Sequence, residues 1–281
     1  MFKLDEVLVL DYLIEAREEL AAAERDLLAI ESQGEHLDKE RINRICLALH
    51  SVKSGSLLFN LVKIAELAQK TENAMARIRF QSIAPTQARV SVLLRAIDRL
   101  TEMILEPDTS NEVDMSGLMA ELAMPDASRQ ATFEKGGATE DSPANGTRGR
   151  LRILIVEDDL ACRLLLQTFL ARYGECHVAL NGREAVEAFR TALSCGSSYD
   201  LICMDIMMPE MDGREAVRQI RAFEEERGIR SPYGATIFMT TTVQEIREVF
   251  QCFRELCDAY LLKPIDLGQL LTKMMFFQLV K

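Results

Sequence analysis

The sequence predicts two domains of different fold class, an all-α bundle followed by a doubly wound α/β domain. Three observations support this. Residues 5–105 repeat apolar side chains at three- and four-residue spacing, residues 107–150 are rich in Ser, Gly, Pro and acids, and short apolar runs then alternate with amphipathic segments. A chain of 281 residues has room for both. We therefore place the domains at 1–106 and 151–281.

The first domain is predicted to contain four helices that pack as an antiparallel four-helix bundle. Gly34 interrupts the pattern after the first helix, Asn60 falls between the second and third, and Pro85 suits the first turn of the fourth. The predicted helices cover residues 5–31, 39–59, 61–79 and 85–105.

Residues 107–150 are predicted to form a flexible linker. The stretch from Lys135 to Thr147 has too few apolar side chains to bury a core of its own. Val113 to Met124 is an exception, because its apolar residues could form a short amphipathic helix able to dock on either domain. We assign this helix no function.

The second domain shows five predicted strands alternating with five predicted helices, the pattern of a doubly wound α/β sandwich. The strand segments are short and mainly apolar, as expected for parallel strands buried on both faces. The predicted strands cover residues 152–157, 176–180, 200–205, 235–240 and 258–262. The predicted helices cover residues 160–173, 182–194, 212–227, 243–256 and 266–278.

Polar residues follow four of these strands. Glu157 and Asp158 end the first, Asp205 the third, Thr240 the fourth and Lys263 the fifth. The carboxyl ends of parallel strands meet at one edge of a sheet, where such folds bind ligands. An ionised carboxylate at a strand-to-loop corner can attack phosphorus. The sequence therefore predicts phosphoryl transfer to Asp205.

In this reaction a carboxylate attacks a negatively charged phosphoryl group, so the site needs positive charge nearby. Glu157 and Asp158 supply the oxygen ligands that Mg²⁺ or Mn²⁺ prefers. Lys263 would pair with one phosphoryl oxygen, and the Thr240 hydroxyl would hydrogen-bond another. Asp159 is predicted to cap the following helix rather than bind the cation.

A second candidate site is His50 in the second predicted helix. A neutral imidazole can accept and return a phosphoryl group, and Lys53 lies on the same helix face to balance its charge. Small side chains at residues 54–56 are expected to leave room for another domain. The predicted core stripe, which turns His50 toward the edge or outside, consists of Ile42, Ile45, Cys46, Leu49, Val52 and Phe59.

Composition argues against several classes of function. A net charge of −11 and a pI near 5.0 disfavour direct binding to DNA, which requires an excess of Lys and Arg. No uninterrupted apolar stretch approaches the roughly 20 residues of a membrane span. The acidic start Met1 to Glu6 does not suit a signal peptide. We therefore expect a cytoplasmic protein that binds neither DNA nor membranes.

With these residues in place, residues 151–281 resemble a response-regulator receiver domain over its whole length. The resemblance implies a flavodoxin-like sheet of order 2-1-3-4-5 and phosphorylation of Asp205. It also implies that Asp158 binds Mg²⁺ directly, that Glu157 acts directly or through water, and that the Met207 backbone carbonyl completes the protein's ligands.

The same resemblance implies two further features and shows one departure. The Lys263–Pro264 peptide bond is expected to be cis. Tyr260, three residues before the lysine, would be the aromatic switch that turns inward on phosphorylation. The departure is a long segment from Glu224 to Gly234, which affects the surface beside the fourth strand and leaves the chemistry intact.

Residues 1–105 resemble a histidine phosphotransfer (HPt) domain, and their long acidic first helix is similar to the amino-terminal domain of chemotaxis-type kinases. The resemblance implies that His50 is phosphorylated and that Lys53 stabilises the phosphoryl group. Ser54 stands where that family more often has Gly. This exchange of one small residue for another leaves the approach of a partner possible.

These resemblances predict a two-component phosphorelay protein that carries phosphoryl groups on His50 and Asp205. Nothing in the chain resembles a kinase's ATP domain, so we expect a phosphotransfer protein rather than an enzyme. Its expected partners are a sensor histidine kinase and other receiver or phosphotransfer domains. The alternative is a phosphorylation-gated interaction module that uses only Asp205. A phosphate-ester hydrolase would need a second acid two residues after Asp205, where Met207 stands.

Overall fold

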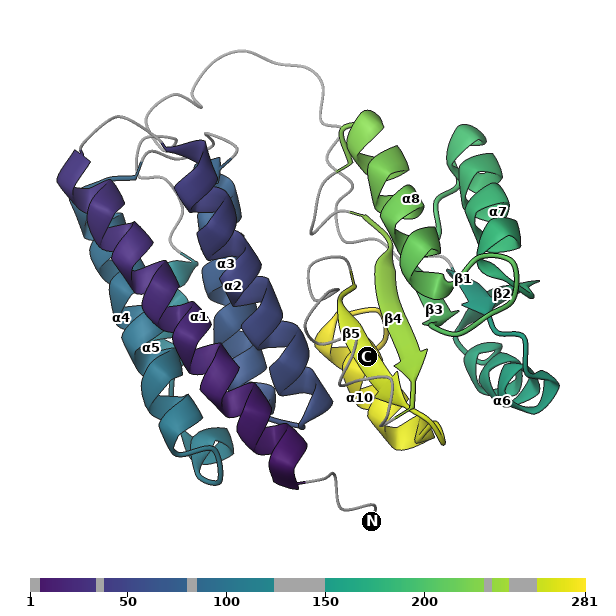
Figure 1. Ribbon diagram of the computed structural model, residues 1–281, viewed down its shortest axis with the longest axis horizontal. Helices are drawn as coiled ribbons and strands as arrows, with labels where there is room; N and C mark the ends of the chain where they lie inside the picture. Colours follow the sequence, from purple (N-terminus) through teal and green to yellow (C-terminus); the bar gives the residue numbers. More distant parts are fainter. Residues whose placement is uncertain (1–5, 34–37, 80–84, 124–149, 230–233, 243–256) are drawn as a thin grey trace, which may run out of the picture. The chain divides into compact units, whose positions relative to one another are not determined.

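The chain folds into two compact units, Met1–Gly146 and Thr147–Lys281 (Figure 1). The computed structural model describes residues 6–33, 38–79, 85–123, 150–229, 234–242 and 257–281. None of the helices in these ranges is long and apolar enough to cross a membrane.

The first unit contains the four predicted helices, each within two residues of its predicted ends. They are α1 (Glu6–Gln33), α2 (Lys39–Leu58), α3 (Val62–Arg79) and α4 (Gln87–Leu105). Helix α2 packs between α1 and α3, and α4 contacts both α1 and α3, which closes the bundle. The apolar spacing explains the packing, because the α1 residues that it places on one stripe are all buried: Tyr12, Ala16, Leu20, Ala23, Leu27 and Ile30.

The small residues after His50 serve the packing of this bundle. Gly55 faces the Tyr12 ring of α1, and a Cβ on Gly55 would lie 2.7 Å from Tyr12 Cδ2. The Tyr12 hydroxyl donates to the Val52 carbonyl at 3.0 Å and lies 2.6 Å from the Ser56 hydroxyl. The prediction that Gly55 and Ser56 leave room for another domain is therefore wrong, since α1 fills that space.

The first part of the predicted linker belongs to the bundle unit. A 3₁₀ helix, η1 (Ser110–Glu112), packs against α3, and a short helix, α5 (Ser116–Leu122), packs against α3 and α4. Asn111 fixes this segment, because its side chain accepts from the Lys63 amide and donates to the Asn60 carbonyl, both at 3.2 Å. The packing of η1 differs from the flexible linker expected at the start of residues 107–150, whereas α5 agrees with the short docked helix expected within residues 113–124. Residues 124–149 lie outside the described residues.

The second unit is built on a five-stranded parallel sheet in the order β2-β1-β3-β4-β5. The fold class and the 2-1-3-4-5 order are therefore confirmed. Every residue of β3 is buried, which accounts for the apolar run that precedes Asp205. The strands are β1 (Leu151–Val156), β2 (Gly174–Ala179), β3 (Leu201–Asp205), β4 (Thr236–Thr241) and β5 (Ala259–Leu262).

Helices cover both faces of this sheet. Figure 1 shows α7 and α8 side by side on one face, with α6 and α10 on the other. Each helix begins after a side chain that accepts its first free amides: Asp159, Asn181, Asp212 and Asp266. The helices are α6 (Leu160–Leu170), α7 (Gly182–Ser194), α8 (Gly213–Glu226) and α10 (Leu267–Phe276), and the predicted helix at 243–256 lies outside the described residues.

A buried ion network anchors the segment that departs from the family pattern. Arg221 of α8 contacts Glu224 at 2.7 Å and Asp258 at 2.8 Å. The two carboxylates in turn accept the amides of Ala235 and Ile237 at the start of β4. This network lies at the amino end of β4, away from the strand ends that carry the predicted site. The geometry agrees with the expectation that the departure leaves the chemistry intact.

Candidate functional site

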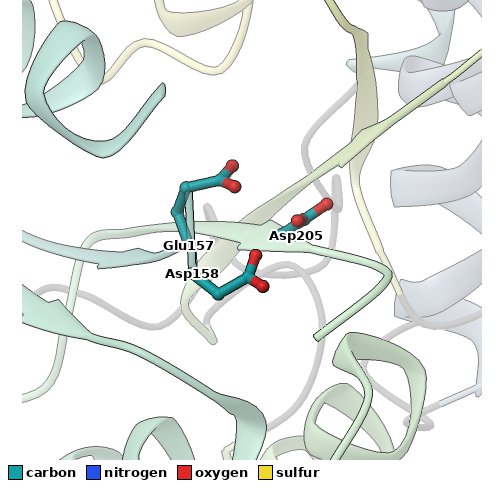
Figure 2. Close-up of side chains that lie close together, drawn as sticks. All are labelled: Glu157, Asp158 and Asp205. Atoms are coloured by element: carbon teal, nitrogen blue, oxygen red, sulfur yellow. The ribbon is translucent and has the colours of Figure 1, made fainter. Parts of the chain in front are cut away.

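The sheet brings the predicted acids together at its carboxyl edge. Glu157 and Asp158 follow β1, and Asp205 ends the neighbouring β3. Their carboxylate oxygens lie within 4.8 Å of one another, and Figure 2 shows the three groups gathered on one side of the strand ends. Thr240 of β4 is the register partner of Asp205. Four residues predicted from three strand ends thus share one site.

Lys263 supplies the positive charge that this acidic cluster requires. Its ammonium lies 3.0 Å from Glu157 Oε1 and 2.8 Å from Asp205 Oδ2. Backbone geometry holds it there, since the Lys263 amide donates to the Thr241 carbonyl at 2.7 Å and the following bond to Pro264 is cis, as predicted. One cation therefore bridges two buried carboxylates.

Burial sets the acidity of these groups. It raises the pKa of Asp205 to about 6, aided by the charge of Glu157, while the hydrogen bond and charge of Lys263 act in the opposite direction. Burial alone would lower the pKa of Lys263, but its hydrogen bonds to Asp205 and Glu157 raise that pKa to about 12. The shifted pKa values keep the lysine charged at neutral pH and make Asp205 a weaker acid than an exposed aspartate.

Two buried polar atoms at this edge indicate that the site binds a further group. Glu157 is fully buried and Thr240 is 1% exposed. Within the described part of the chain, Glu157 Oε2 and Thr240 Oγ1 have no hydrogen-bond partner. An orphaned buried oxygen costs about 1–3 kcal/mol. A hard cation would satisfy the carboxylate and a phosphoryl oxygen the hydroxyl, so the donor set fits Mg²⁺ with a phosphoryl group.

The loop after β3 is held close to Asp205 by a glycine. A side chain on Gly213 would collide with the Asp205 carbonyl, and the Gly213 amide donates to the Ile206 carbonyl at 2.9 Å. The close approach brings the start of α8 against the Asp205 backbone. Met207 lies in this loop with its side chain 56% exposed, and its carbonyl stays a predicted ligand.

Tyr260 lies on β5 and is 1% exposed, among the largest fully buried side chains of the chain. It sits next to the site by register, because it pairs with Met239, the residue before Thr240. Its role as a switch stays a prediction.

In the bundle, the imidazole of His50 is engaged by a carboxylate from the next helix. His50 Nδ1 lies 3.0 Å from Glu72 Oε1 of α3, and Lys53 Nζ lies 3.0 Å from Glu72 Oε2. His50 is 8% exposed, so its ring is not turned to the outside, one of the two orientations predicted from the core stripe. The attraction of Glu72 draws the ring toward α3.

Sequence reasoning missed Glu72, which lies 22 positions from His50. A signal was present in the sequence. Glu72 interrupts the apolar stripe of α3 at a position flanked by the buried Ala68, Thr71 and Met75. A carboxylate beside such a stripe requires a partner on the facing helix.

The charges fix which nitrogen of His50 carries the proton. Burial would raise the pKa of Glu72, but the positive charges of Lys53 and His50 and their hydrogen bonds hold it at about 2. The ionised carboxylate can only accept, so Nδ1–H must be the donor to Glu72. Lys53 Nζ lies 3.2 Å from the same nitrogen and donates to Glu72 Oε2 at 3.0 Å. With the proton on Nδ1, the neutral ring has its lone pair on Nε2.

Comparison with known families assigns both units. Residues 7–103 match the Hpt domain model, and residues 153–275 match the response regulator receiver domain model. The regulatory protein AtoC of Escherichia coli is 37% identical over 122 residues, which are 42% of this chain and 23% of that protein. The sensor protein GacS of Pseudomonas syringae is 31% identical over 189 residues, covering 67% of this chain and 19% of that protein.

A solved structure with 30% sequence identity is the complex of the Saccharomyces cerevisiae histidine phosphotransfer protein Ypd1 with the receiver domain of its response regulator Ssk1. The match covers 45% of this chain and 87% of that chain, with a TM-score of 0.37. The chain spans less than a quarter of the length of the two curated relatives named above.

Proposed function

This chain combines an Hpt domain with a response regulator receiver domain, and we propose that it acts as a two-component phosphorelay protein. Asp205 accepts a phosphoryl group in the receiver domain, and His50 carries one in the Hpt domain. Neither matched family is a kinase, so the phosphoryl group comes from outside. The expected partners are a sensor histidine kinase and other receiver or phosphotransfer domains, with output through protein contacts.

The observation that carries the receiver half of this proposal is the pair of orphaned buried atoms beside Asp205. Within the described residues Glu157 Oε2 and Thr240 Oγ1 are buried without a hydrogen-bond partner, which supports a cation and a phosphoryl oxygen as the missing partners. A bound Mg²⁺ or Mn²⁺ would be held by Asp158, Glu157, Asp205 and the Met207 carbonyl, and would neutralise charge that develops on the phosphoryl oxygens.

The chain's own residues perform the transfer as follows. An Asp205 carboxylate oxygen attacks phosphorus, a P–O bond forms, and the bond from phosphorus to the donor breaks, so that the donor leaves with that electron pair. Lys263, already 2.8 Å from Asp205, moves its hydrogen bond to a phosphoryl oxygen. The Thr240 hydroxyl donates to another phosphoryl oxygen and so gains the partner it lacks.

Transfer to the Hpt half uses the opposite exchange. Nε2 of His50 attacks the phosphorus of an aspartyl phosphate, the P–N bond forms and the P–O bond breaks, which regenerates the carboxylate. Glu72 accepts from Nδ1–H at 3.0 Å and stabilises the positive charge that the ring acquires. Lys53 lies close enough to pair with the phosphorylated ring.

A second function is favoured by one observation. His50 is 8% exposed, so its ring has to be uncovered before an aspartyl phosphate can reach it. If it is not uncovered, the protein is a phosphorylation-gated interaction module in which Asp205 is phosphorylated by an outside donor and the surface near Tyr260 changes partner.

Phosphorylation with ³²P-labelled acetyl phosphate and Mg²⁺ distinguishes the two functions. We expect label on Asp205 that is lost in Asp205→Asn, and acid-labile, base-stable label that is lost in both His50→Gln and Asp205→Asn. Label confined to Asp205 and unaffected by His50→Gln would support the gated module. A wild-type protein that takes up no label on Asp205 would contradict the proposed function itself.

A further inference from the structure

The turn that carries the two metal-site acids is fixed by an arginine outside the predicted site. Asp158 is exposed, and within the described residues its carboxylate has no hydrogen-bond or ion-pair partner. Glu157, by contrast, is buried and held by Lys263 at 3.0 Å. The Asp158 side chain is therefore oriented by its backbone and its own rotamer rather than by a partner side chain.

Arg163 of α6 holds that backbone. Its Nη1 donates to the Glu157 carbonyl at 2.8 Å and to the Asp158 carbonyl at 3.0 Å. In the described part of the chain Arg163 forms no ion pair with a carboxylate, so its hydrogen bonds go to these two oxygens. Arg163 is itself fixed by the helix, since its amide donates to the Asp159 carbonyl at 3.0 Å and Asp159 caps the same turn.

The two carbonyls lie in the peptide planes on either side of the Asp158 Cα. Anchoring both to one guanidinium nitrogen fixes both planes, and this fixes the direction of the Cα–Cβ bond between them. The Asp158 carboxylate is then oriented toward Glu157 and Asp205 before a ligand arrives. Groups that orient metal ligands in this way commonly change metal affinity about 10–100-fold when removed.

We propose that Arg163 is a positioning residue of the cation site, which preorganises Asp158 through the main chain. This inference rests on the cation site of the proposed function, and Arg163 is not among the residues predicted for that site. Asp158 remains the ligand, and Arg163 acts only through it.

The sign of the effect separates this role from a purely electrostatic one. Arg163 is a positive charge beside a site for a positive ion. If it contributed only its charge, removing it would leave the affinity for a divalent cation unchanged or raise it. If it positions Asp158, removing it lowers the affinity, because the carboxylate loses its preferred direction.

Binding of Mn²⁺ to the full chain, measured by the loss of free-ion signal in electron paramagnetic resonance, tests the proposal without any phosphoryl transfer. We expect Arg163→Met to weaken binding about tenfold. The matched control is Arg172→Met, which removes the same charge just after α6, where Arg172 stacks on Phe169 and Tyr173. That variant should bind Mn²⁺ as the wild type does.

Arg163→Lys keeps the charge and one donating nitrogen, so part of the affinity should return. The melting temperature in EDTA shows whether each variant is folded. Equal or tighter Mn²⁺ binding by Arg163→Met would overturn the proposal, as would binding by Arg163→Lys as weak as by Arg163→Met. If the wild type binds no Mn²⁺, the chain lacks this cation site and the proposed function fails with it. If all variants bind Mn²⁺ as the wild type does, only the role of Arg163 is refuted.

Discussion

Replacing Glu72 by Gln should destabilise the bundle. It should also allow the neutral His50 ring to carry its proton on either Nδ1 or Nε2. The change keeps the shape of the side chain and removes its charge. Lys53, which is 3% exposed, then loses its ion pair at 3.0 Å, and Nδ1 of His50 loses an ionised acceptor. Removing one partner of a buried pair is costly because the other charge stays buried.

The pKa of Glu72 gives the size of the effect. It lies at about 2 against an ordinary value of 4.5. One pKa unit corresponds to about 1.4 kcal/mol. The lowered pKa therefore means that the folded bundle favours the ionised Glu72 carboxylate by roughly 3 kcal/mol. Because the folded pKa is lowered, this stabilisation is fully present above pH 4.5 and is lost as the pH falls toward 2. At pH 7, Glu72→Gln should therefore lose all of this stabilisation.

Hydrogen exchange of the α2 and α3 amides in the full chain measures this loss within the bundle. We expect the opening free energy to fall by roughly 3 kcal/mol in Glu72→Gln. Glu66→Gln is the matched control on the same helix. Its pair with Lys63 is also 3.0 Å, but the two side chains are 35% and 41% exposed, so the loss should stay below about 1 kcal/mol.

Long-range ¹H–¹⁵N correlation of the imidazoles reports the proton position directly, and the chain has only three histidines to assign. We expect the neutral His50 ring of the wild type to carry its proton on Nδ1, and Glu72→Gln to mix the two tautomers. The reasoning is refuted if Glu72→Gln costs no more than Glu66→Gln at pH 7 and leaves the His50 tautomer unchanged.

Two further predictions concern packing and pH. Gly55→Ala forces a methyl group against the Tyr12 ring and should lower the opening free energy of α2, measured by hydrogen exchange, by about 1–3 kcal/mol. Gly117→Ala, with open space around it, should be neutral or slightly stabilising. Equal effects of the two variants would contradict the packing argument. The pKa of Asp205 is raised to about 6 from 3.8, so the folded receiver holds this proton more tightly than the unfolded chain, and stability in EDTA should fall as pH rises from about 4 to 6. Thermal unfolding should show that Asp205→Asn removes this decline and makes the metal-free protein more stable than the wild type at pH 7.5, and a decline that persists in Asp205→Asn would show that another group causes it.

The sequence was sufficient for most of the receiver site because the fold makes it a local property of strand ends. Glu157, Asp205, Thr240 and Lys263 each follow an apolar run, and parallel strands bring such positions to one edge whatever the details of packing. The helix spans followed from the alternation of apolar runs and amphipathic segments, and the strand order from the resemblance to receiver domains. The ends of helices differed by a few residues, since capping side chains such as Asp266 decide them.

Other features depended on contacts between helices that local spacing does not encode. The apolar stripe of α2 predicted an edge or outward position for His50, but Glu72 of α3 draws the ring inward. Small residues after His50 suggested open space, yet Gly55 is small because Tyr12 of α1 packs on it.

The sequence by itself determined the two fold classes, the bundle helices and the residues of the receiver site, because periodicity and strand ends are properties of neighbouring positions. Only the tertiary structure decided which side chains outside these patterns meet. Glu72 meets His50 across two helices, and Arg163 meets the carbonyls of Glu157 and Asp158 through a turn of main chain. The physical reason is that hydrogen bonds are short and directional, so the three-dimensional positions of donor and acceptor decide whether they form.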